Sequence, residues 1–337
     1  MSDETRAWYL RAARELAATS ARQVEWCLGV ADDPRMLGLL DTLPHAARQP
    51  SLLFAVAAWL GAPDAPYLEW ADAVLARSAE LARELPRRRV QTNEPGRCVP
   101  LVVALDRIPG PLALVELGAS AGLCLLPERY GYRVRTGDGV GTLGDGAPVL
   151  EARVDDAALV PHALPDIRWR RGVDLAPLDV DDPDDVRWLE ASLPPDRPDR
   201  VARLRRAIET ARADPPLVRA GDALGTLASA AAEAPPDATL VVASLGTAVY
   251  LPPSEREGLL AAIAAVGARA VTFEARGALP RVAERWDALA REGQADADAA
   301  FVLALDGEPL ASGTPHGDVL RAAGPSAGRA GAEASRS

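Results

Sequence analysis

The sequence predicts an α/β protein: a helical N-terminal region followed by a doubly wound, mostly parallel sheet that closes with an antiparallel hairpin. Up to about residue 107, apolar residues recur at helical spacing and no alternating strand pattern appears. From residue 111, short apolar runs alternate with helical segments, which is typical of a parallel sheet covered on both faces. Near the end, "FVLALDGEPLASG" places Asp-Gly between two apolar runs, which indicates a hairpin.

Residues 1–108 are expected to form a helical domain. Its last helix has Thr92 or Asn93 as the cap, with Glu94 and Pro95 in the first turn. The segments that predict helices are "ETRAWYLRAARELAATS", "DDPRMLGLLDTLP", "QPSLLFAVAAWLGA", "PYLEWADAVLARSAELARELP" and "QTNEPGRCVPLVVALDRIPG".

Residues 109–321 are expected to form the α/β domain. Strands are predicted at 111–117, 131–136, 216–220, 238–244, 268–274, 300–305 and 308–312. Helices are predicted at 122–130, 222–233, 253–266 and 279–292.

An insertion at about 139–215 separates the second strand from the third. It is rich in aspartate, but the spacing does not match an EF-hand loop, so Asp182 or Asp184 is expected to cap a helix instead. The low-complexity segment 322–337 is expected to be a disordered tail.

Composition narrows the function classes. A net charge of −11 lacks the basic footprint of a nucleic-acid binder. Three scattered cysteines without C-x-x-C, with three histidines, argue against a structural metal site and for a reducing compartment. The chain has no signal-peptide core and no run of roughly 18 apolar residues, so a cytoplasmic protein without a membrane segment is expected.

The stretch "PLALVELGASAGLCLL" allows two chemistries. Read literally, "GASAG" is G-x-S-x-G, the nucleophile elbow of serine hydrolases, with Ser120 as nucleophile and His316 as base. The long helical region before the first strand does not fit that fold, and Glu116 would repel a developing oxyanion.

The second interpretation is a turn of small residues that receives a ligand at the carboxyl edge of the sheet. Asp138 follows Gly118 by 20 positions, just past the second strand, where an acid would take a ribose diol. A pyrophosphate dinucleotide fits less well, because G-x-G-x-x-G is not met and Glu116 would repel phosphate. The residues expected to contact the ligand are Glu116, Gly118, Ala119, Ser120, Gly122, Asp138, Asp222 and Ser244.

Glu116 with its small-residue turn, an acid after the second strand, "GDA" after the third and a terminal hairpin resemble class I S-adenosylmethionine-dependent methyltransferases, whose sheet is Rossmann-like. The resemblance implies that Gly118 to Gly122 pass the methionine part, that Asp138 binds ribose and that Asp222 lies near adenine. The positively charged sulfonium suits Glu116 and an acidic protein.

A closer resemblance covers residues 8 to 320. The motifs "RQPSLLFA", "QTNEPGR", "VELGASAGL", "PLDVDDPDDVRWLEA", "AVYLPPSER" and "LALDGEPLASGTPHG" are similar to an uncharacterised bacterial family known as a domain of unknown function. The chain departs from that family at Cys124, where the family usually has Asn, and at Ser244, where it often has His.

Further candidates complete the site. Tyr250 and His316 are candidate catalytic residues, each with a purely structural alternative. Asn93, Glu94 and Arg97 are expected to lie over the ligand cleft and contact substrate, or else to form a capping box. The expected function is S-adenosylmethionine binding, with methyl transfer to a small molecule. The alternatives are a non-catalytic ligand-binding or interaction protein on the same fold and an esterase using Ser120. The sequence leaves the oligomeric state open.

Overall fold

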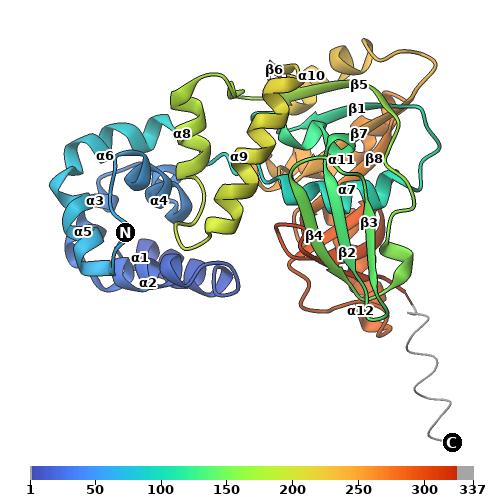
Figure 1. The fold of residues 1–337 in the computed structure, drawn as a ribbon. Coiled ribbons are helices and arrows are strands. Elements are labelled where there is room, and N and C mark those ends of the chain that lie inside the picture. The colour runs from blue at the N-terminus through green and yellow to red at the C-terminus, as the bar shows by residue number, and fades with distance from the viewer. Residues whose placement is uncertain (1, 325–337) are drawn as a thin grey trace, which may run out of the picture. The chain divides into compact units, whose positions relative to one another are not determined.

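The computed structural model describes residues 2–324. It is an α/β protein with a mixed sheet of 11 strands and 12 α-helices in this part of the chain (Figure 1). The chain forms two compact units. Of the described residues, unit 1 comprises 2–92 and 179–204, and unit 2 comprises 93–178 and 205–324.

Unit 1 is helical, as the apolar spacing predicts. Ser20 caps α2 by accepting a hydrogen bond from the backbone N–H of Gln23, and Asp33 caps α3 in the same way through Arg35. The segment expected as one long helix from Tyr67 is two helices, because the backbone leaves the helical conformation at Arg77. The helices are α1 (Ser2–Glu15), α2 (Ala21–Asp32), α3 (Pro34–Asp41), α4 (Pro50–Trp59), α5 (Tyr67–Ala76), α6 (Ser78–Glu84), α8 (Pro183–Ala191) and the first part of α9 (Pro198–Ala213).

An aromatic cluster fills the core of unit 1. The rings of Trp26 and Trp70 stack with centroids 4.6 Å apart, and Phe54 packs edge-on against Trp70 at 5.8 Å. All three side chains are buried. Aromatic contacts of this kind add to the free energy gained by burial alone, so the cluster fixes α2, α4 and α5 to one another.

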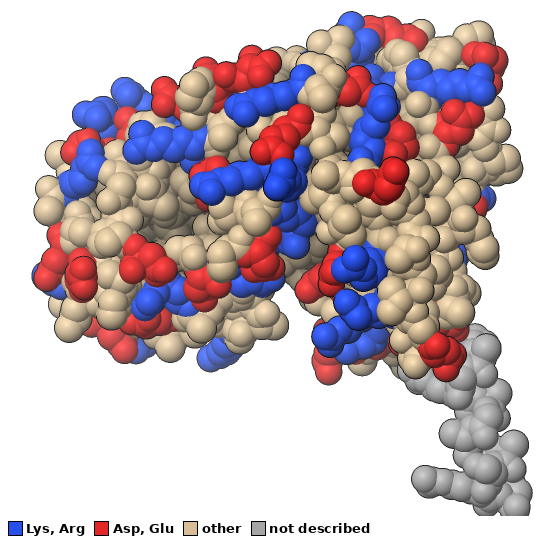
Figure 2. Space-filling model, viewed as in Figure 1, with Lys and Arg blue, Asp and Glu red and all other residues tan. Residues whose placement is uncertain are grey.

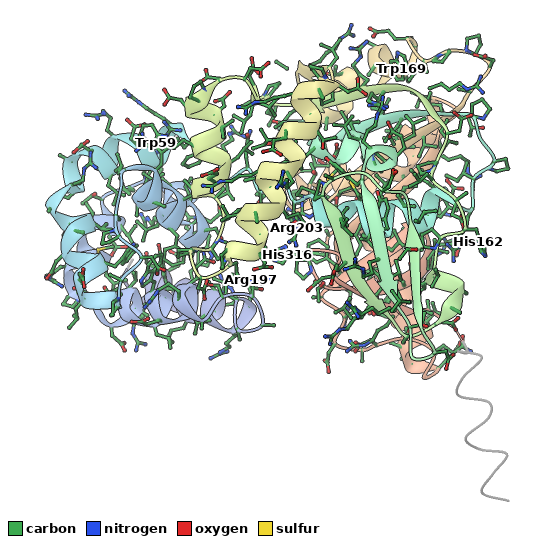
Figure 3. All side chains as sticks on the ribbon, viewed as in Figure 1. Trp59, His162, Trp169, Arg197, Arg203 and His316 are labelled. Atoms are coloured by element: carbon green, nitrogen blue, oxygen red, sulfur yellow. The ribbon has the colours of Figure 1, made fainter. Side chains whose placement is uncertain are left out.

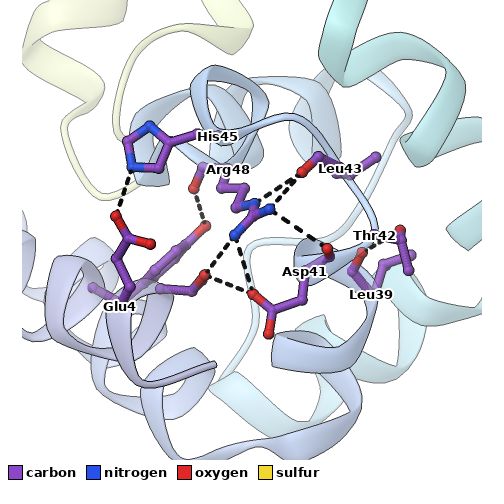
Figure 4. A network of polar contacts seen from close by, with 9 residues as sticks. Glu4, Leu39, Asp41, Thr42, Leu43, His45 and Arg48 are labelled. Carbon is purple, nitrogen blue, oxygen red and sulfur yellow. Dashed lines mark hydrogen bonds and ion pairs between the residues drawn. The ribbon is translucent and has the colours of Figure 1, made fainter. Parts of the chain in front are cut away.

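A buried arginine joins the N-terminal helices (Figure 4). The Arg48 guanidinium donates to the backbone carbonyl of Leu43 at 2.8 and 2.9 Å and pairs with Asp41 at 3.3 Å. Thr5 donates its hydroxyl to the same carboxylate at 2.8 Å, and Tyr9 donates to the Arg48 carbonyl at 3.1 Å. The charge is therefore both paired and hydrogen-bonded, as a buried charge requires.

Unit 2 is built on the sheet, whose strand order is β3-β2-β4-β11-β10-β9-β8-β7-β1-β5-β6. The five strands from β8 to β6 are parallel to one another. The bounds are β1 (Leu112–Leu117), β2 (Gly131–Arg135), β3 (Val140–Leu143), β4 (Val149–Val154), β5 (Ile167–Asp174), β6 (Val218–Ala220), β7 (Thr239–Leu245), β8 (Arg269–Ala275), β9 (Phe301–Leu305), β10 (Glu308–Gly313) and β11 (Val319–Ala322).

Helices α10 (Ala223–Ala231), α11 (Pro253–Ala265) and α12 (Pro280–Arg291) cover one face of the parallel region. They share an apolar cluster with Val115 and Leu117 of β1. Because side chains alternate along a strand, Leu114 and Glu116 point to the opposite face. Helix α7 (Cys98–Leu105), which is buried throughout, packs against β8 and β9. None of the described helices is both long and apolar enough to span a bilayer.

Two expectations about the sheet are wrong. The region 139–215 is not simply an insertion, since it contributes β3, β4 and β5. The second strand, β2, does not pair with β1, because six strands lie between them, and β5 takes the place beside β1. The predicted hairpin of β9 and β10 is confirmed, and β11 pairs with β10 beyond it.

Strand β5 escapes sequence analysis because arginines interrupt its apolar pattern. Arg170 pairs with Asp214 at 3.1 Å and with Glu128, and Arg171 pairs with Glu233 at 2.7 Å. The strand therefore buries charged residues through tertiary ion pairs that no local pattern reveals.

The helix expected at 122–130 is also wrong. Two short 3-10 turns, Leu123–Leu125 and Pro127–Arg129, stand in its place. Pro127 lacks a backbone N–H and disfavours helical geometry at Leu126, so the turn after Gly122 cannot extend into an α-helix. The segment 322–337 was expected to be a disordered tail, but its first residue, Ala322, belongs to β11. Residues 325–337 of that segment lie outside the described part of the chain.

We expect Arg48→Met to lower the free energy of unfolding of unit 1 by about 3 kcal/mol, because it leaves the Asp41 carboxylate, whose side chain is 12% exposed, without the buried Arg48 cation. Arg6→Met is the control. It removes the exposed Arg6–Asp32 pair, which contributes about 0–1 kcal/mol. Urea unfolding followed by tryptophan fluorescence reports on unit 1, which holds Trp8, Trp26, Trp59, Trp70 and Trp188 of the seven tryptophans. Equal losses in the two variants would contradict the assignment.

Candidate functional site

The candidate site lies at the carboxyl edge of β1 in unit 2. Leu117, the last residue of β1, pairs with Val173 of β5 on one side and with Ser244 of β7 on the other. Three loops therefore leave the sheet at the same edge, beginning at Gly118, Leu175 and Gly246. The carboxyl edge of parallel strands is where open α/β sheets bind ligands.

The turn after β1 is held in a left-handed conformation. The φ angles are +72° at Gly118, +53° at Ser120 and +75° at Gly122. The N–H of Gly118 donates to the Val173 carbonyl at 2.8 Å, and the N–H of Ser120 donates to the Asp174 carboxylate at 2.8 Å. A serine in this conformation is uncommon, and the hydrogen bond to Asp174 offsets part of its cost.

The glycines of the turn are required by the protein's own packing. A Cβ on Gly118 would lie 2.2 Å from Oγ1 of Thr247, and one on Gly122 would lie 2.6 Å from Cγ of Pro216. A turn of small residues is also what a site that receives a ligand would need. The positive φ angles and the neighbouring side chains account for both positions.

Glu116 is buried two residues before the turn. Its side chain is 3% exposed, and Oε2 has no hydrogen-bond partner among residues 2–324. Burial raises the pKa of the Glu116 carboxyl well above its usual range; the nearby Cys124 and Asp174 raise it further, and Arg97 opposes them. A buried carboxyl with an unsatisfied oxygen is costly unless something compensates it, which makes Glu116 a candidate ligand group.

The acid that lies beside the turn is Asp174 and not Asp138. Asp138 is exposed in the β2–β3 hairpin, where its own N–H bonds to Thr136, so the sheet does not bring it to β1. Asp174 ends β5 and lies half-buried beside the turn. The sequence interpretation missed it because β5 was not recognised as the strand next to β1.

Two other expected contacts take hydrogen-bonding roles at this edge. Asp222, which is exposed, caps α10 by accepting from the N–H of Gly225 at 2.7 Å. Ser244 is buried next to Glu274, and its hydroxyl donates a hydrogen bond to the Glu274 carboxylate at 2.7 Å.

Glu274 is a second buried carboxyl that the sequence interpretation missed. It is the penultimate residue of β8, and its side chain is 2% exposed. Burial raises its pKa, although hydrogen bonds from Ser244 and the backbone of Thr247 and Ala248, and the charge of Arg97, work against the shift. Oε1 accepts the two bonds from Ser244 and Thr247, and Oε2 has no partner within the described chain. The sequence did contain one indication of Glu274, because it is the last residue of the strand predicted at 268–274.

The cluster Asn93, Glu94 and Arg97 belongs to unit 2, which begins at Asn93. Asn93 accepts from the N–H of Leu123, and Glu94 caps the short turn Pro95–Arg97. Arg97 donates to the carbonyls of Leu245 at 2.7 Å and Pro315 at 3.1 Å. Glu94 therefore has the expected capping role, and Arg97 connects the end of β7 to the connection between β10 and β11.

The two candidate catalytic residues lie on connections near Arg97. Tyr250 is 61% exposed in the loop after β7. His316, labelled in Figure 3, lies in the connection from β10 to β11, next to Pro315, whose carbonyl accepts from Arg97. A Cβ on Gly96 would lie 2.3 Å from the His316 carbonyl, so this connection packs closely on the Arg97 turn.

Two buried carboxyls lie near one arginine at this edge of the sheet. Glu116 and Glu274 are both buried, both carry an oxygen without a hydrogen bond, and Arg97 is the cation that opposes the pKa shift of each. Two carboxyls near one arginine leave the site able to become negative. On the surface shown in Figure 2, by contrast, acidic and basic side chains are interspersed. Within the described part of the chain, no three His, Cys, Asp or Glu side chains are grouped to hold a metal ion.

We expect Gly118→Ala to lower the free energy of unfolding of unit 2 by about 2 kcal/mol or more. The new Cβ would collide with the Thr247 side chain, and the alanine would have to keep the positive φ of Gly118. Gly137→Ala is the control, because nothing lies within 4 Å of its Cβ position and its φ is not positive; its effect should stay within about 0.5 kcal/mol. Scanning calorimetry measures both, and a well-tolerated Gly118→Ala would show that the turn is not close-packed.

We expect Glu116→Gln to become more stabilising, relative to the wild type, as pH rises. The folded-state pKa of Glu116 is raised. Between the unfolded value, about 4.3, and that raised value, the unfolded chain loses its proton first, so the wild-type free energy of unfolding falls. The amide cannot ionise and avoids that loss. Urea unfolding at pH 5 and pH 8 tests this, with the exposed Glu257→Gln expected to follow the wild type. A constant difference between Glu116→Gln and wild type at both pH values would contradict it.

The comparison with known proteins adds the family. No curated protein and no solved structure matched the chain. The family described as "Uncharacterized protein conserved in bacteria (DUF2332)" matches residues 59–321, which include every part of the site described above. The chain belongs to this bacterial family.

Proposed function

We propose that unit 2 binds S-adenosylmethionine at the carboxyl edge of β1, β5 and β7. The observation that carries the proposal is Glu116: a buried carboxyl with an unpartnered oxygen, placed just before a small-residue turn at the end of a central parallel strand. The sulfonium and ammonium groups of S-adenosylmethionine are cations and would compensate this carboxyl once it ionises.

The neighbouring residues fit the rest of the ligand. Asp174 already accepts from the N–H groups of Ser120 and Ala176. An acid at the carboxyl end of a strand beside the turn is the type of group that binds the hydroxyls of a ribose. Asp222, at the carboxyl end of β6, remains the candidate for the adenine side. A phosphate-bearing ligand fits less well, because Glu116 and Asp174 would repel it.

Methyl transfer to a small molecule is the second part of the proposal. Bound S-adenosylmethionine supplies an activated methyl group. The chain's own residues would then mainly hold donor and acceptor in line and exclude water. A protein that binds the same ligand without turnover is the alternative on this fold, and transfer of a labelled methyl group distinguishes the two. The elbow of an esterase calls for an α-helix after Ser120, and the chain forms 3-10 turns there.

Titration calorimetry with S-adenosylmethionine tests the proposal. We expect Asp174→Asn to weaken binding about tenfold or more, because a charge-assisted hydrogen bond is worth roughly 1.5–3 kcal/mol. Asp138→Asn is the matched control at the acid that the sequence favoured, and it should leave the affinity unchanged. Absence of binding by the wild type at millimolar ligand would reject the proposal, and equal effects of the two variants would reject the assigned acid.

The role of Glu116 has its own signature in the same experiment. The cationic ligand should bind more tightly than its demethylated, uncharged-sulfur product, and Glu116→Gln should reduce that difference. Because the free carboxyl has a raised pKa, binding of a cation that ionises it should release protons. Binding enthalpies in buffers of different ionisation enthalpy then differ for the wild type and converge for Glu116→Gln.

A further inference from the structure

The loop that follows β7 lies directly on the glycine turn. Thr247 fills the position that a Cβ of Gly118 would occupy, with Oγ1 2.2 Å and Cγ2 2.4 Å from it. One residue earlier, a Cβ on Gly246 would lie 2.7 Å from Cζ of Arg97, and Gly246 has a φ of +77°. The segment from Gly246 to Tyr250, called the β7 loop below, therefore covers the turn from one side.

Glu274 holds the start of the β7 loop. Its Oε1 accepts from the N–H of Thr247 at 2.9 Å and from the hydroxyl of Ser244 at 2.7 Å. These bonds come from residues on either side of Gly246, so the carboxyl fixes the bend at which the chain leaves the strand.

The far end of the β7 loop is held independently. Arg256, in α11, donates to the carbonyls of Val249 at 2.7 Å and Leu251 at 2.8 Å. Between the two anchors, Ala248 is buried in the apolar cluster of unit 2, whereas Val249 is 39% and Tyr250 is 61% exposed. Ala248 is the one buried side chain from Gly246 to Tyr250, and a segment that buries so little apolar area opens at a small cost in free energy.

We propose that Thr247 gates the ligand site and that Glu274 is the positioning residue that keeps the gate closed. The inference rests on the proposed function. With the β7 loop in place, the Thr247 side chain occupies the space over Gly118, so a ligand reaches the backbone of the turn from this side only after the loop moves. The closed form excludes the ligand, and the ligand binds the open form.

This arrangement has a quantitative consequence. When only a fraction of the protein is open, the apparent dissociation constant equals the intrinsic constant divided by that fraction. A change that removes the Thr247 contact without touching the ligand's partners must therefore tighten binding. An open fraction of about one tenth allows a gain of up to about tenfold.

Hydrogen exchange of the full chain without ligand tests the positioning role. We expect Glu274→Ala to speed exchange of a peptide covering 246–250 at least tenfold. Glu274→Gln, which keeps an oxygen acceptor, should show a smaller change. Peptides from β1 report on global stability and should be unchanged in both. Unchanged exchange of the β7 loop in Glu274→Ala would reject the positioning role, whether or not the protein binds S-adenosylmethionine.

Calorimetry and stopped-flow binding of S-adenosylmethionine test the gate. We expect Thr247→Ala, which keeps the backbone N–H that bonds to Glu274, to bind more tightly and associate faster, by up to about tenfold. Val249→Ala, in the exposed part of the same loop, should match the wild type. Wild-type binding with an unchanged or weakened Thr247→Ala rejects the gate and leaves the proposed function standing. Absence of binding by both proteins at millimolar ligand rejects the proposed function and the gate together.

Discussion

The left-handed turn after β1 is the constraint on which the rest of the site depends. Gly118 and Gly122 must adopt positive φ angles, and the chain around them is packed so closely that neither position accepts a side chain. The turn is fixed by groups from the neighbouring strands: the Val173 carbonyl and the Asp174 carboxylate of β5, and Thr247 after β7. Because these strands flank β1 in a parallel sheet, the turn is formed correctly only once the sheet is formed.

Burial of carboxyl groups gives the same edge its chemical character. Glu116 lies before the turn and Glu274 lies beside the β7 loop, and each has an oxygen that no described residue satisfies. The two differ in what surrounds them. Glu274 is bound by the loop it holds, whereas Glu116 is stabilised as a neutral acid by burial and by nearby Cys124 and Asp174. One residue is therefore suited to fixing the loop and the other to meeting a positive charge.

Unit 1 shows how differently charge is used away from this edge. Arg48 is buried as well, but two carbonyl bonds, the Asp41 carboxylate and the Thr5 hydroxyl surround its guanidinium. Arg48 joins helices and serves the stability of that unit. The contrast supports treating the unpartnered carboxyls of unit 2, rather than every buried charge, as candidates for binding.

The sequence by itself determined the α/β class, the helical start of the chain, seven of the strands within a few residues and the turn at Gly118 to Gly122. These follow from local apolar periodicity and turn chemistry, which a single segment carries. Only the tertiary structure decided that β5 lies beside β1, that Asp174 rather than Asp138 borders the turn, and that Thr247 packs on the turn and donates its N–H to Glu274. Strand order depends on non-local pairing. The arginines of β5 hid its strand character, because the ion pairs that make it stable in the sheet come from distant parts of the chain.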